Sequence, residues 1–125
     1  MVKPRILIVE DDFDTQIFLR LFLSKHFEVD ICRSDEGFYS KIKEIKFDLI
    51  IMDIGIKGDK DGLYLTREIK NSAKYKSIPV LCLSAHVMQQ DKKNAYDAGV
   101  DAFLEKPVQN ETLLRNIWTL LGTEK

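Results

Sequence analysis

The sequence has few of the features that mark a disulfide scaffold, a membrane span or a nucleotide-binding loop. Its only cysteines, Cys32 and Cys82, lie in apolar runs without a CxxC or Cys/His spacing, which favours buried, reduced thiols over a disulfide or redox pair. The opening MVKPRILIVEDD contains four consecutive apolar residues, too few for a signal peptide or a transmembrane helix. Neither GxGxxG nor GxxxxGK[ST] follows this run, and the carboxylates found there would repel a pyrophosphate unless a metal intervened.

Charge of one sign is not in excess either. The 19 basic and 20 acidic residues leave a net charge of −1, so the composition shows no bias toward nucleic acid or an anionic membrane. Apolar residues make up 45% of the chain and charged residues 31%, which is typical of a globular protein. We expect one domain over residues 4–122, with short tails at 1–3 and 123–125, in a reducing cytoplasm.

Five short apolar runs alternate with helical patterns and predict an α/β fold. The runs are Ile6–Val9, Val29–Cys32, Leu49–Met52, Val80–Ser84 and Ala102–Leu104. Such alternation is typical of a parallel sheet covered by helices on both faces. The first, third and fourth runs are nearly continuous Ile, Leu and Val, as in central strands, whereas the second alternates like an edge strand. With right-handed crossovers, this favours a doubly wound five-stranded sheet in the order 2-1-3-4-5.

Helix signals lie between these runs. Ser34 and Asn110 are expected N-caps, Gly99 is an expected C-terminal cap, and Asp12 and Asp14 are expected helix N-terminal charges. The first expected helix is more apolar than one core-facing stripe requires. Either it packs against both the sheet and a neighbouring helix, or the excess forms a partner-docking surface. Its apolar residues are Ile17, Phe18, Leu19, Leu21, Phe22 and Leu23.

Polar side chains stand at the ends of four of the expected strands. Glu10 and Asp11 follow the first, Asp53 ends the third, Ser84 ends the fourth and Lys106 follows the fifth. Each of them taken alone is ordinary strand-end or loop chemistry. In an open parallel sheet, however, ligands bind outside the carboxyl ends of the strands. We therefore expect these side chains to converge on one cleft.

Three carboxylates and a lysine in one cleft indicate a particular chemistry. At about 4 Å and an effective dielectric near 20, each pair of carboxylates repels by roughly 4 kcal/mol. Protonation or a bound dication would relieve this repulsion, and an all-oxygen ligand set suits Mg²⁺. With an ammonium and a hydroxyl beside the metal, a free carboxylate could attack phosphorus in line, so the pattern suits phosphoryl transfer.

Four segments in this order, RILIVEDD, DLIIMDIGIKGDKDGL, IPVLCLSA and FLEKP, resemble the receiver domain of two-component response regulators over nearly the whole chain. The resemblance implies a flavodoxin-like fold of the stand-alone receiver type. It also implies that Asp53 accepts a phosphoryl group from a sensor histidine kinase or a histidine phosphotransfer protein. Glu10 and Asp11 would hold Mg²⁺ together with Asp53 and the main-chain carbonyl of Gly55.

The resemblance also assigns switch residues. Lys106 would form an ion pair with Asp53 or its phosphoryl group, and Ser84 would turn its hydroxyl toward the phosphoryl oxygens. Phe103 occupies the aromatic switch position, where the ring would move inward as Ser84 moves. The peptide bond between Lys106 and Pro107 is typically cis in this family.

The output surface implied by the resemblance comprises Met88–Gly99 and Ala102–Leu121. Its downstream protein target is unknown, and phosphorylation-dependent dimerisation through this face stays open. No direct nucleic-acid binding and no membrane insertion are expected, since no helix-turn-helix or basic stripe follows the domain. No enzymatic activity is expected beyond Mg²⁺-dependent self-phosphorylation and self-dephosphorylation.

The sequence departs from the family pattern in two places, the loop after Asp53 and the segment after Ser84. Asp61 and Gly62 come one residue later than the commonest spacing, and Lys57 stands where proline is common, so a looser loop is expected. Gly55 and His86 occupy positions that tune phosphoryl lifetime in the family. Glycine offers no side chain to shield phosphorus from water, and the histidine either bonds a water or the phosphoryl group or has no role. The lifetime itself stays open.

Two other readings compete with the receiver. A pseudo-receiver would act as a non-phosphorylated interaction module, but it would have lost the acceptor, the acid pair or the lysine, and all are present. A haloacid dehalogenase-type phosphatase would carry a second acid two residues after its nucleophile, where this chain has Gly55. Whether the natural protein is a stand-alone receiver or a larger protein is left open.

Overall fold

One parallel sheet organises the chain, of which the computed structural model describes residues 3–56, 58, 60–85 and 88–122. Within these residues the sheet has five strands in the order β2-β1-β3-β4-β5, which confirms the predicted doubly wound topology with β2 at an edge. The strands are β1 (Arg5–Val9), β2 (Glu28–Cys32), β3 (Leu49–Asp53), β4 (Val80–Ser84) and β5 (Ala102–Glu105). The helices are α1 (Phe13–Leu23), α2 (Asp35–Glu44), α3 (Gly62–Lys70), α4 (Gln89–Ala98) and α5 (Asn110–Leu120).

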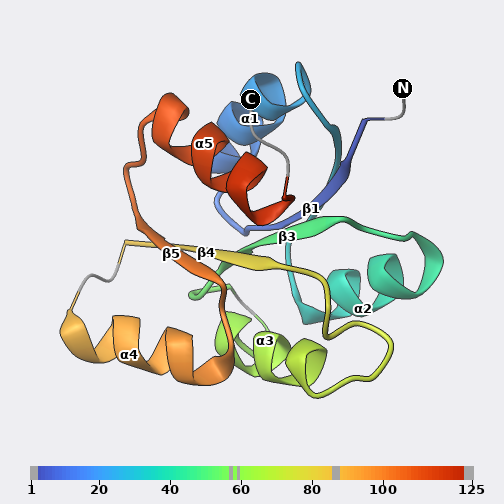
Figure 1. Cartoon of the computed structure of the whole chain (residues 1–125), viewed down its shortest axis with the longest axis vertical. Coiled ribbons are helices and arrows are strands. Elements are labelled where there is room, and N and C mark those ends of the chain that lie inside the picture. Colours follow the sequence, from blue (N-terminus) through green and yellow to red (C-terminus); the bar gives the residue numbers. More distant parts are fainter. Residues whose placement is uncertain (1–2, 57, 59, 86–87, 123–125) are drawn as a thin grey trace.

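The helices cover both faces of the sheet. Figure 1 shows α1 and α5 on one face and α2, α3 and α4 on the other. Successive side chains of a strand point to opposite faces, so Ile6 and Ile8 of β1 join the core under α1 and α5. Leu7 and Val9 join the core under the other three helices. This two-sided burial explains why the central strands are nearly continuous apolar runs.

The caps largely follow the sequence signals. Ser34 accepts a hydrogen bond from the Gly37 N–H at 3.5 Å at the start of α2. Gly99 ends α4 with a φ of 108°, a conformation that favours glycine. The prediction for Asn110 is wrong by one residue, because the extended backbone at Gln109 makes that residue the cap and Asn110 the first helical residue.

The first helix leaves much of its apolar surface exposed. Only its Leu19 and Leu23 are buried, whereas Phe13 and Leu21 are 70% and 68% exposed. Packing against the sheet and the neighbouring helix therefore accounts for part of the apolar excess, and the remainder is surface. None of the helices in the described parts of the chain is long and apolar enough to span a membrane.

Candidate functional site

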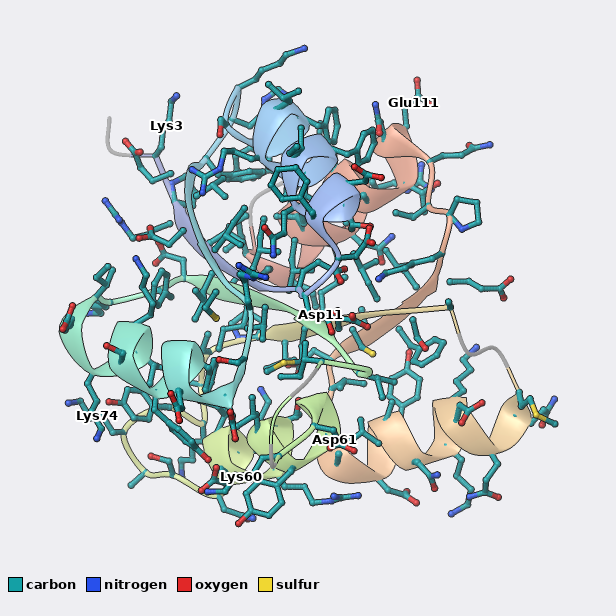
Figure 2. The ribbon with its side chains drawn as sticks, turned by 180° about the vertical axis from the view of Figure 1, so that it is seen from behind. Lys3, Asp11, Lys60, Asp61, Lys74 and Glu111 are labelled. Carbon is teal, nitrogen blue, oxygen red and sulfur yellow. The ribbon has the colours of Figure 1, made fainter. Side chains whose placement is uncertain are left out.

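The carboxyl ends of four strands bring polar side chains to one edge of the sheet. Glu10 and Asp11 follow β1, Asp53 ends β3, Ser84 ends β4 and Lys106 follows β5. The strands are parallel and paired in register, so all four end at the same edge. Figure 2 shows Asp11 at this edge, where the chain leaves β1 for α1. The structure thus brings the five predicted residues to one place.

The three carboxylates form a tight cluster. One oxygen each from Glu10, Asp11 and Asp53 lie within 4.8 Å of one another. At that separation and an effective dielectric near 20, a pair of charges repels by roughly 3 to 4 kcal/mol. Glu10 is only 2% exposed, and its carboxylate accepts the Asp12 N–H at 3.1 Å. Burial raises the pKa of Glu10, aided by the nearby Asp53, although the ammonium of Lys106 opposes this rise.

Lys106 contacts two of these acids. Its Nζ lies 2.7 Å from Oε1 of Glu10 and 3.7 Å from Oδ2 of Asp53, so Glu10 is the nearer partner. Burial lowers the pKa of Lys106, but the hydrogen bond to Glu10 and the charge of Asp53 outweigh it, and the net shift is upward. The following bond to Pro107 is cis, as the resemblance implies. The lysine is therefore held charged inside the cluster.

The loop after Asp53 folds back onto the end of β3. The Gly55 N–H donates to Oδ1 of Asp53 at 3.2 Å, and the Gly62 N–H donates to the main-chain oxygen of Ile54 at 3.1 Å. A Cβ on Gly62 would lie 2.3 Å from the main-chain oxygen of Asp53, so only glycine fits at the start of α3. From the sequence, only the late position of Asp61 and Gly62 was evident, and the close approach of Gly62 to the end of β3 was missed.

Ser84 and Phe103 lie beside the cluster on β4 and β5. Ser84 is 1% exposed, and its main-chain oxygen accepts the Lys106 N–H at 2.8 Å. Phe103 is half-buried, pairs in register with Cys82 and borders a groove of about 640 Å³ between α4 and β5. The predicted lifetime residue His86 and the unusual Lys57 lie outside the described residues.

The donor set fits a hard divalent cation. Among the described residues, three carboxylates face one ammonium, which leaves about two negative charges for an ion to balance. Carboxylate oxygens are ligands that Mg²⁺ accepts, usually together with several waters. The residues present therefore fit the metal that this pattern of acids indicates.

Comparison with known proteins gives concordant matches. A family model described as the response regulator receiver domain matches residues 6–117. Regulatory protein VanRB of Enterococcus faecalis is 32% identical over 118 residues, which cover 94% of this chain and 52% of that protein. Polar-differentiation response regulator DivK of Brucella ovis is 25% identical over 122 residues, 98% of each chain.

A solved structure of a receiver domain has the same fold. The receiver domain of sensor histidine kinase PA1611 from Pseudomonas aeruginosa PAO1 has a magnesium ion coordinated in its active-site cleft. It is 26% identical to this chain with a TM-score of 0.88, over 98% of this chain and 100% of that one. The chain spans about half the length of VanRB and of three further curated relatives that are 29 to 33% identical to it.

Proposed function

Because this chain belongs to the response regulator receiver domain family of two-component systems, we propose that it is a phospho-accepting switch with Asp53 as the acceptor. The observation that carries the proposal is the cluster of three carboxylates with the ammonium of Lys106 at the strand ends. Receiver domains interact with histidine kinases or phosphotransfer proteins. We take such a protein as the phosphoryl donor.

The metal in this proposal is Mg²⁺. Receiver domains bind it at an acidic site, and the carboxylates of Glu10, Asp11 and Asp53 with the main-chain carbonyl of Gly55 would hold it here. When bound, the ion would neutralise charge on the phosphoryl oxygens. A bound dication would relieve the repulsion among the three carboxylates, and this supports Mg²⁺ as the ligand of the cluster.

The transfer itself would be carried by the chain's own residues. A carboxylate oxygen of Asp53 attacks phosphorus as the phosphorus–nitrogen bond of the donor's phosphohistidine breaks, and the imidazole nitrogen keeps the electron pair and takes a proton. The rigid end of β3 aims the carboxylate, and the Gly55 N–H orients one of its oxygens. Lys106 balances negative charge on the phosphoryl group. Later hydrolysis by water would restore the free carboxylate.

Phosphorylation would then act as a switch. It replaces one negative charge on Asp53 by nearly two and adds acceptor oxygens. Lys106 and the hydroxyl of Ser84 gain a new partner, and Phe103 moves inward toward the space that Ser84 leaves. The expected output surface comprises α4, β5 and α5, which would bind an unidentified protein or a second copy of the chain.

A pseudo-receiver is not favoured, because the acceptor, the acid pair and the lysine are all present at one edge of the sheet. A cytoplasmic location is part of the proposal. It is supported by the two buried, free cysteines, which suit a reducing compartment.

Intact mass after incubation with Mg²⁺ and acetyl phosphate tests the proposal. We expect one added phosphoryl group in the wild type, none without Mg²⁺ and none in Asp53→Asn. Asp12→Asn is the matched control, since Asp12 is the N-cap of α1 and asparagine caps a helix equally well. A wild type that neither forms the adduct nor binds beryllofluoride would refute the mechanism.

A further inference from the structure

The loop between β3 and α3 is closed at its base. The Gly62 N–H donates to the main-chain oxygen of Ile54, and the missing Cβ of Gly62 lets the two ends touch backbone to backbone. Gly55, whose carbonyl is the proposed fourth ligand, lies within this loop. This contact fixes only the two ends of the loop, so other contacts must hold the residues between them.

The distal part of the same loop runs along α2. Gly58 has a φ of 132°, and a Cβ there would lie 2.6 Å from Oδ1 of Asp35, the first residue of α2. Two residues further along the loop, Nζ of Lys60 donates to the hydroxyl of Tyr39 at 3.0 Å. Asp35 and Tyr39 are one turn apart on the same face of α2. The loop therefore lies close to α2 at two successive points, and the Lys60–Tyr39 hydrogen bond fixes one of them.

Lys60 also ties this loop to α3. Its Nζ lies 4.9 Å from the ring centroid of Tyr39 and 5.0 Å from that of Tyr64, in the first turn of α3. The Tyr39 hydroxyl in turn donates to the carboxylate of Glu68 on α3. Figure 2 shows Lys60 and Asp61 together near the start of α3. Lys60 thus contacts a tyrosine on each of the two helices.

We propose that Lys60 and Tyr39 are positioning residues that hold the β3–α3 loop in its metal-binding conformation and so set the affinity for Mg²⁺. The inference rests on the proposed function, because it takes Gly55 of this loop as a ligand. Apparent affinity falls in proportion to the fraction of molecules whose site is competent to bind. Loss of the contact with α2 frees the loop and lowers that fraction.

Charge and position predict opposite outcomes for Lys60→Met. Removing a positive charge from the loop should strengthen the binding of a dication on electrostatic grounds alone. Releasing the loop should weaken it. Tyr39→Phe separates the two effects further, because it removes the hydroxyl that accepts from Lys60 while leaving the net charge and the ring unchanged.

The test is a Mg²⁺ titration of the full chain followed by NMR chemical shifts. We expect the Kd to rise about three- to tenfold in Tyr39→Phe and in Lys60→Met, the range that one lost hydrogen bond corresponds to. The rise in the double variant should be smaller than the product of the two single rises, because both changes break the Lys60–Tyr39 hydrogen bond. Lys74→Met is the matched control. Nζ of Lys74 lies 5.3 Å from the ring centroid of Tyr75 beyond the end of α3, and Figure 2 shows Lys74 apart from Lys60. The Kd of the Lys74→Met variant for Mg²⁺ should equal that of the wild type.

Hydrogen exchange of the metal-free chain provides a second readout. Amides of Gly55, Ile56, Gly58, Lys60 and Asp61, the described residues of the loop, should exchange faster in Tyr39→Phe than in the wild type, while urea midpoints show that both proteins remain fully folded. An unchanged Kd in Tyr39→Phe, or tighter binding in Lys60→Met, would overturn the inference while leaving the proposed function intact. A wild type that binds no Mg²⁺ would overturn both.

Discussion

Replacing Lys106 with methionine removes the ammonium from the acid cluster while keeping most of the apolar stem. In the wild type this ammonium lies 2.7 Å from the carboxylate of Glu10, which is almost fully buried. After the substitution, the main-chain N–H of Asp12 remains as a donor to that carboxylate, and the charge of Asp53 still faces it. Glu10 then carries a buried charge with much less compensation.

We expect Lys106→Met to lower the free energy of unfolding of the metal-free protein by about 2 to 3 kcal/mol at pH 7.5. Removing one partner of a buried ion pair typically costs about 3 to 5 kcal/mol. The side chain of Lys106 is 22% exposed, so solvent screens part of the interaction and we expect a loss at or below the lower end of that range.

The loss should depend on pH in a defined direction. Burial already raises the pKa of Glu10 above its ordinary value of 4.5, and the Lys106 hydrogen bond opposes the rise, so removing that bond raises this pKa further. A carboxyl group whose pKa is higher in the folded than in the unfolded protein destabilises the fold only when it is ionised. This loss of unfolding free energy is absent below about pH 4.5 and complete above the pKa of the folded state. The variant should therefore approach wild-type stability as the pH falls from 7.5 toward 4.5.

Mg²⁺ should restore much of the loss at pH 7.5, because a dication can replace the missing positive charge. Urea unfolding measures the free energy of unfolding of each protein in EDTA and in Mg²⁺. The signal is the fluorescence of Trp118, whose ring centroid lies 4.9 Å from that of Phe27. Lys93→Met is the control: its ion pair with Asp97 is 68% and 61% exposed, so the change should be below about 0.5 kcal/mol. Equal losses for Lys106→Met at pH 7.5 and pH 4.5 would refute the reasoning.

Two glycine substitutions and one labelling experiment test the packing of the chain. Gly62→Ala should cost about 1 to 3 kcal/mol in urea unfolding, because its Cβ would lie 2.3 Å from the main-chain oxygen of Asp53. Gly55→Ala, whose Cβ would have no neighbour nearer than 4.0 Å, should stay within about 0.5 kcal/mol, and an equal loss in both would contradict the steric argument. Burial raises the pKa of Cys32 and Cys82 to about 12. Both thiols should therefore be labelled at pH 8 roughly 1,000-fold more slowly in the native than in the unfolded protein. Comparable labelling rates in the two states would show that the thiols are accessible in the native protein.

Local residue patterns were enough to predict the sheet and the place of the site. Continuous apolar runs reflect strands buried on both faces, and the alternating second run reflects an edge, so the strand order followed from the sequence. Because parallel strands end at one edge, the convergence of Glu10, Asp53 and Lys106 was also predictable. The N-cap of α5 was missed by one residue, because residue patterns fix the existence of a helix more sharply than its ends.

Other features depend on how the elements pack. Lys106 lies closer to Glu10, 96 residues away, than to the Asp53 that the family pattern indicated. The relative placement of β1, β3 and β5 sets these distances. The approach of Lys60 to Tyr39 likewise requires α2 and the β3–α3 loop to lie side by side. Residue periodicity encodes which face of an element is buried, but it does not encode which individual side chains meet across two elements. Contacts of this kind, on which charge balance and metal affinity depend, are decided by tertiary packing.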